Sequence, residues 1–150
     1  MKFTCSVVIN APREKVTSLF NDEKYLKEWQ DGYQGSQLLS GESGKEGAKS
    51  KIIFLQGKRS MELLETIEVV DMPYEKTALY EHAHMTNSMQ NIFEELENGH
   101  TKYSAHIHYT EFHGLVPRLM ARFFPKLFKK QAQKWLDQFK HFVEHYSEKA

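Results

Sequence analysis

The sequence predicts one α+β domain, residues 1–150, in which a seven-stranded antiparallel sheet curves around a long C-terminal helix. Three observations support this fold class. Apolar residues alternate at the N-terminus, β-type runs separated by turn signals follow from about Tyr33 to about Leu115, and helical spacing returns after that. A curved sheet that holds one apolar helix tends to enclose a cavity, so this order of elements favours a small-molecule binder.

The N-terminal elements follow from a change of hydrophobic period. Residues 3–9 alternate between apolar and more polar side chains, as in a half-buried strand, and Asn10 and Pro12 end that pattern. Two short helices are expected next, each with one apolar face. These faces comprise Val16, Leu19, Phe20, Tyr25, Leu26 and Trp29.

Turn signals divide the middle of the chain into six further strands. They lie at residues 41–47, 56–58, 71–74, 86–88 and 98–99, where residues that favour turns, such as Gly, Asn, Asp and Pro, gather. The last of them, Asn98 followed by Gly99, is the strongest hairpin signal of the set. Consecutive strands are therefore expected to pair as an antiparallel meander.

The C-terminal segment carries one long apolar stripe at helical spacing. Its members are Val116, Leu119, Met120, Phe123, Leu127, Phe128, Trp135, Phe139, Phe142, Val143 and Tyr146. Pro125 removes one backbone hydrogen bond and crowds the carbonyl of Ala121, so a kink or a break is expected there.

The same segment is basic. No acidic residue occurs from Phe112 to Leu136, whereas six cations do: Arg118, Arg122, Lys126, Lys129, Lys130 and Lys134. A basic amphipathic helix can dock on anionic lipid, which leaves transient membrane contact open. The favoured interpretation is that the apolar stripe covers the sheet and the charges form its wet side.

The turn at Asn98 and Gly99 also predicts which side chains face inward. As a two-residue loop it pairs Ile92 with Ala105 and Glu94 with Tyr103 on the buried face. A turn at residues 86–88 continues that face to Leu79 and Glu81, and the preceding strand contributes its more apolar set, Met61, Leu63, Glu65, Ile67 and Val69.

Three carboxylates, those of Glu65, Glu81 and Glu94, fall on this inner face. A buried carboxylate requires a partner, water or a ligand, so they are expected to line a partly polar cavity. A local β-bulge would instead send one or more of them to solvent. The predicted ligand-binding set is Trp29, Met61, Leu63, Glu65, Leu79, Glu81, Gln90, Ile92, Glu94, Tyr103, Ile107, Tyr109, Met120, Phe123 and Phe124, in which Trp29 and the two phenylalanines guard an entrance.

Other chemistries find little support. His82, His84, His106 and His108 are expected on the outer face, too far apart for one closed metal site, so neither a metal nor a cofactor is expected. The glycine-rich segment at 41–47 lacks the Ser or Thr and the following helix of a phosphate-binding loop. No catalytic residue is assigned.

Composition narrows the class of protein further. Lys and Arg together number 20, as do Asp and Glu, so no overall field attracts nucleic acid, and a nucleic-acid partner is not expected. The lone Cys5 excludes an intramolecular disulfide, and no stretch has the length of a signal peptide core or a membrane span. A cytoplasmic protein is expected, with its oligomeric state undetermined.

The sequence also resembles a known superfamily. The residues from Ile9 to Pro12, followed by apolar positions up to Trp29, are similar to the opening of START-like, helix-grip (SRPBCC) proteins, particularly the polyketide cyclase/dehydrase and lipid transport branch. The glycine-rich hairpin, the turn at 98–101 and the closing helix with Leu136, Phe139 and Lys140 extend the resemblance over nearly the whole chain. It implies a seven-stranded sheet around the C-terminal helix and a cavity for lipids, polyketides or other hydrophobic molecules.

Three functions are consistent with these features. Binding or carriage of a small hydrophobic molecule, without catalysis, is favoured. The second is a cyclase or dehydratase in which Glu65, Glu81 or Glu94 is a general base and Tyr103 or Tyr109 a proton donor. The third is a regulator that binds a partner protein, in the manner of chaperone activators, through an exposed apolar patch.

Overall fold

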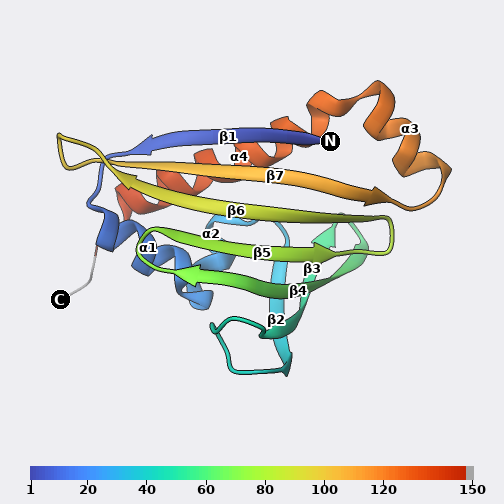
Figure 1. Cartoon of the computed structure of the whole chain (residues 1–150), viewed down its shortest axis with the longest axis horizontal. Helices are drawn as coiled ribbons and strands as arrows, with labels where there is room; N and C mark the ends of the chain where they lie inside the picture. The colour runs from blue at the N-terminus through green and yellow to red at the C-terminus, as the bar shows by residue number, and fades with distance from the viewer. Residues whose placement is uncertain (148–150) are drawn as a thin grey trace.

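A computed structural model describes residues 1–147 and confirms a seven-stranded antiparallel sheet with a long C-terminal helix (Figure 1). The strands are β1 (Lys2–Ile9), β2 (Tyr33–Ser40), β3 (Lys49–Gln56), β4 (Arg59–Asp71), β5 (Glu75–Glu81), β6 (Met85–Glu95) and β7 (Thr101–Phe112). The helices are α1 (Arg13–Asn21), the 3-10 turn η1 (Glu23–Tyr25), α2 (Leu26–Trp29), α3 (Leu115–Phe123) and α4 (Pro125–His145). The strand order β1-β7-β6-β5-β4-β3-β2 makes β1 and β2 the edges.

The predicted interruption at Pro125 is a break between two helices. α3 ends at Phe123, Phe124 has non-helical angles of φ −131° and ψ 49°, and Pro125 begins α4. Proline suits this position because the first N–H groups of a helix have no partner within it. The break lets α3 run in a different direction from α4, as Figure 1 shows.

The core lies where α1, α2 and α4 meet the β1, β7 and β6 side of the sheet. Phe20 is central, with four aromatic ring centroids between 5.1 and 5.8 Å from its own: Trp29, Phe93, Tyr103 and Phe139. α4 buries Leu136, Phe139 and Val143 here, so this part of the predicted stripe does cover the sheet. No helix within residues 1–147 is long and apolar enough to cross a membrane.

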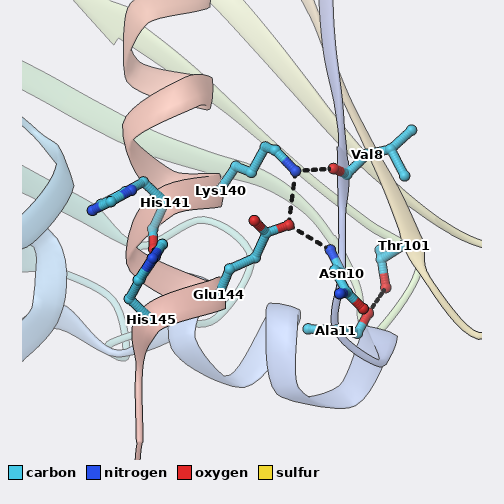
Figure 2. Close-up of polar contacts among 8 residues, drawn as sticks. All are labelled: Val8, Asn10, Ala11, Thr101, Lys140, His141, Glu144 and His145. Atoms are coloured by element: carbon cyan, nitrogen blue, oxygen red, sulfur yellow. Dashed lines mark hydrogen bonds and ion pairs between the residues drawn. The ribbon is translucent and has the colours of Figure 1, made fainter.

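α4 also closes the open edge of β1 with polar side chains. The Lys140 ammonium donates to the carbonyl of Val8 at 2.7 Å, and Gln133 donates to the carbonyl of Ser6 at 3.1 Å. Figure 2 shows how Glu144 completes this contact: one carboxylate oxygen accepts from Lys140 and from the backbone N–H of Asn10, both at 2.7 Å. Unpaired carbonyls of an edge strand would otherwise be open to another chain.

The predicted pairing of β6 with β7 is wrong by one residue. The turn is a three-residue loop, in which the N–H of Leu96 donates to His100 O at 2.8 Å and Gly99 adopts φ 82°. A type I turn followed by a left-handed glycine is the usual form of a three-residue hairpin loop. The sequence had predicted a loop of two residues. Phe93 therefore pairs with Tyr103, and every β6 side chain changes face.

The turn between β5 and β6 also differs from the prediction. His82 and Met85 exchange backbone hydrogen bonds around a two-residue loop, whereas residues 86–88 lie inside β6. The inner face of β5 therefore carries Ala78 and Tyr80. Five residues of β5 and β6 that were expected on the inner face lie on the outer one: Leu79, Glu81, Gln90, Ile92 and Glu94.

The prediction for β4 is confirmed from Met61 to Ile67. Glu65 shares the inner face with Ile67, which is buried and pairs with buried Ala78. A register shift between Ile67 and Val69 then moves Val69 outward, where it is 36% exposed. The sequence allowed for a β-bulge that would turn a carboxylate to solvent. The bulge occurs in β4, but it comes after Glu65, which stays on the inner face.

We expect Glu144→Gln to lower the free energy of unfolding at pH 7 by about 1 kcal/mol, because it removes a charge-assisted contact between α4 and β1. Burial alone would raise the pKa of Glu144, but the Asn10 N–H and Lys140 outweigh burial and hold the pKa below its ordinary value of 4.5. The contribution should therefore be complete above about pH 4.5 and disappear as the pH falls through the lowered pKa.

Urea unfolding of the wild type and Glu144→Gln between pH 3 and 7 would measure this difference. Glu97→Gln, at an exposed position in the β6–β7 loop, is the matched control and should change stability little at any pH. Equal losses for the two variants would contradict a specific role for Glu144.

Candidate ligand-binding face

A row of polar side chains crosses the inner face of the sheet from β7 to β3. Backbone pairing joins Tyr109 to Asn87, Asn87 to Tyr80, Tyr80 to Glu65, and Glu65 to Ser50. Residues directly opposite in antiparallel strands project from the same face, so these five form one line. We call them the polar row. Each is only partly buried, so the row lies outside the packed core.

Apolar side chains border the polar row on both sides. On one side the paired residues Ile107, Met89, Ala78 and Ile67 form a parallel line that approaches the core. On the other side lie Phe112 with Met85, and Leu63 with Ile52. A few polar groups within an apolar surface are typical of a site that binds and orients a small molecule.

Two aromatic contacts connect α4 with the two ends of this face. Phe128 packs edge-on against Tyr109 of β7, with ring centroids 5.2 Å apart. Further along α4, Trp135 stacks on Phe54 of β3, with ring centroids 5.6 Å apart. α4 thus reaches both β7 and β3, with the middle of the polar row on the strands between them. The indole N–H of Trp135 is buried and has no hydrogen-bond partner among the described residues.

Glu65 and Tyr80 form a hydrogen-bonded pair in the middle of the row. The Tyr80 hydroxyl donates to Glu65 Oε2 at 2.9 Å. Burial, followed by the neighbouring Glu65 charge, raises the pKa of Tyr80 well above its ordinary value. Tyr80 therefore keeps its proton at neutral pH and is a hydrogen-bond donor. Because it donates to Oε2, the other Glu65 oxygen can accept a hydrogen bond from another molecule.

A second polar pair on the inner face is structural. Tyr103 is fully buried and donates to Asn91 Oδ1 at 2.6 Å, while the Asn91 amide donates to the carbonyl of Lys76 at 3.2 Å. Burial raises the pKa of Tyr103. Both residues are enclosed by the core, so Tyr103 cannot reach a bound molecule as the proposed proton donor.

The predicted site residues separate into four groups. Met61, Leu63, Glu65, Ile107 and Tyr109 lie on the inner face with buried Tyr103, whereas the five misassigned residues face outward. Trp29 is only 5% exposed and stacks on Phe20 at 5.8 Å, so it belongs to the core and guards no entrance. Met120, Phe123 and Phe124 lie on or directly after α3 and are exposed.

Sequence reasoning missed Tyr80, Asn87 and Trp135 as site residues. Tyr80 and Asn87 share the face of Glu65, but the register errors placed their strands the other way round. Asn87 had also been assigned to a turn at residues 86–88, whereas it lies inside β6. Trp135 was assigned to the apolar stripe, and its unpartnered N–H is visible only in the packed structure.

The histidines do not assemble into one site. His106 and His108 project from the outer face as predicted, whereas His82 and His84 occupy or adjoin the β5–β6 turn. Among residues 1–147, no three His, Cys, Asp or Glu side chains are grouped so that they could hold a metal ion.

An open groove of about 1520 Å³ runs along α4, but it lies on the solvent side of that helix. Its lining includes Lys130, Lys134, Gln138 and His141, so it is distinct from the inner face of the sheet. The enclosed internal cavity expected from the sequence stays a prediction.

Known structures of the same architecture cover nearly the whole chain. A START superfamily protein from Mycobacterium smegmatis is 12% identical with a TM-score of 0.76, covering 97% of this chain and 99% of the other. A conserved protein from Geobacillus kaustophilus is 15% identical with a TM-score of 0.77, and the match covers 95% of each chain. Ara h 8.0201 is 13% identical with a TM-score of 0.74, and the match covers 95% of this chain and 97% of the other.

No protein-family profile matches the sequence, and no curated protein matches it significantly. Identities of this size establish the fold and leave the activity undetermined. With the antiparallel sheet, the closing helix and these neighbours in agreement, the chain has the START-like, helix-grip fold.

Proposed function

We propose that this protein binds a small, largely apolar molecule on the inner face of the sheet, beneath the N-terminal half of α4. The observation that carries this proposal is the polar row, which is partly accessible, is bordered by apolar side chains and lies on a face that α4 reaches at β7 and at β3. A packed core would not need a carboxylate and four further polar side chains at these positions.

The residues of the face favour a particular kind of ligand. Met61, Leu63 and Met89 offer apolar surface, where burial contributes roughly 25 cal/mol for each Å². Glu65 and Asn87 offer hydrogen-bond acceptors, and each net hydrogen bond contributes only about 1 kcal/mol. Apolar contact would therefore supply most of the affinity, and the polar row would orient a hydroxyl or similar donor group. A lipid- or polyketide-like alcohol has this chemistry.

Glu65 and Tyr80 also support a second candidate, an enzyme of cyclase or dehydratase type. A carboxylate held by a phenol at 2.9 Å on an accessible face could accept a proton from a bound polyketide. Glu81 and Glu94, the other two bases considered, face outward and cannot take this role. Loss of polyketide conversion in Glu65→Gln, with binding retained, would favour catalysis over carriage.

Native mass spectrometry of freshly purified protein tests binding without a choice of ligand. We expect a population heavier than the bare chain, and organic extraction should recover a hydrophobic molecule that contains a hydroxyl group.

We expect Leu63→Trp to weaken binding of the neutral fluorescent dye Nile red at least about tenfold, because the larger ring fills space on the inner face. Leu64→Trp is the matched control, since Leu64 is the next residue of β4, is also half-buried and faces outward. Fluorescence titration measures both affinities, and thermal unfolding confirms that both variants fold. Equal losses would contradict the assignment of the site to the inner face.

We expect Glu65→Gln to weaken binding of a fluorescent fatty alcohol by roughly tenfold while changing Nile red binding by no more than about twofold, because only the alcohol donates to the carboxylate. Glu62→Gln, on the outer face of the same strand, should leave both probes unaffected. If Glu65→Gln weakened both probes equally, an orienting role for Glu65 would be excluded.

A further inference from the structure

We propose that α3 and its junction with α4 dock on the surface of an anionic lipid bilayer. Seven large apolar side chains within residues 115–127 are between 36% and 72% exposed: Leu115, Val116, Leu119, Met120, Phe123, Phe124 and Leu127. We call them the apolar patch. Sequence analysis favoured a stripe that covers the sheet throughout, but the structure buries it only in α4. This surface is independent of the ligand-binding proposal.

The direction of α3 explains why the patch is exposed. Five of its residues recur at positions i, i+1, i+4, i+5 and i+8, which form one helical face. Pro117 and Ala121, on the opposite side, are the half-buried residues of α3. The helix therefore turns its small side, Pro117 and Ala121, toward the protein and its apolar side to solvent. A helix that packs on its own domain does the reverse.

Charge identifies the partner. Arg118, Arg122, Lys126, Lys129 and Lys130 accompany the patch, and residues 112–136 contain no Asp or Glu. The Arg122 guanidinium lies 5.5 Å from the centre of the Phe123 ring, so cation and apolar surface are adjacent. An interfacial helix with this combination buries its apolar side chains near the acyl chains and places its cations among anionic headgroups.

A bilayer suits this patch better than a second copy of the chain. Two copies in contact through α3 would bring the same cations together, and like charges at an interface are unfavourable. α3 has nine residues, about 13 Å of helix, so it would lie in the plane of the membrane surface.

Docking there would bring the ligand-binding face close to lipid. Phe128 follows the patch by one residue and contacts both Tyr109 and Phe112 on β7, with ring centroids 5.2 and 5.7 Å away. A hydrophobic molecule could then pass between bilayer and protein with little exposure to water.

Vesicle sedimentation tests the apolar part of the proposal. The protein should bind phosphatidylcholine vesicles that contain phosphatidylserine, and the double variant Phe123→Ser with Phe124→Ser should bind at least about tenfold more weakly. The control is Leu38→Ser with Leu39→Ser, which removes two similarly exposed side chains from β2 and should bind like the wild type. Equal binding by both double variants would overturn the proposal.

Charge variants test the choice of partner. Replacing Arg122, Lys126 and Lys130 with Gln should weaken binding at least about tenfold, whereas the same change at Lys27, Lys45 and Lys58 should have little effect. Binding should fall as salt increases and be weak on pure phosphatidylcholine. No binding of the wild type to anionic vesicles would overturn the proposal, and in that case self-association lost in the Phe123 and Phe124 variant would assign the patch to a second copy.

Discussion

The attachment of α4 to β1 is the constraint on which the rest of the structure depends. β1 is an edge strand, and Lys140 and Gln133 from α4 bind two of its free carbonyls while Leu136 and Phe139 enter the core beside it. The polar contacts determine the position of the helix along the strand, and burial supplies most of the stability. Because α4 is held at this edge, its aromatic side chains must extend to reach the other strands.

That arrangement gives the two halves of the inner face different properties. Near β1, β7 and β6 the side chains meet helices directly, and Tyr103 and Asn91 are sealed with all their polar atoms satisfied. Toward β3, α4 makes contact through the long side chain of Trp135, which stacks on Phe54. Glu65 and Tyr80 remain partly accessible there. The same sheet thus combines a packed core with a surface that can receive a ligand.

The sequence predicted the elements well because hydrophobic period is a local property. Strand alternation, the turn-rich middle segment and the break at Pro125 each depend on neighbouring residues, and all appear in the structure. The face of the sheet from which each side chain projects was predicted less accurately, because it depends on the length of each turn. One additional residue in the Gly99 loop reversed β6, and β5 had been oriented from β6.

The candidate site was therefore predicted only in part. Glu65 was placed correctly because the face of β4 was inferred from its own apolar residues. Tyr80, the partner of Glu65, requires the long-range pairing of β4 with β5, which no local pattern encodes.

α3 also shows that a local pattern can predict an element without predicting what that element contacts. Its apolar period is stronger evidence for a helix than for what the helix contacts, since a stripe that covers a core and one that enters a membrane have the same spacing. The difference lies in Pro125, which frees α3 from the course of α4, and in the half-buried Pro117 and Ala121. Once these turn the small side of α3 inward, its apolar side must face outward, next to the end of α4 that borders the polar row.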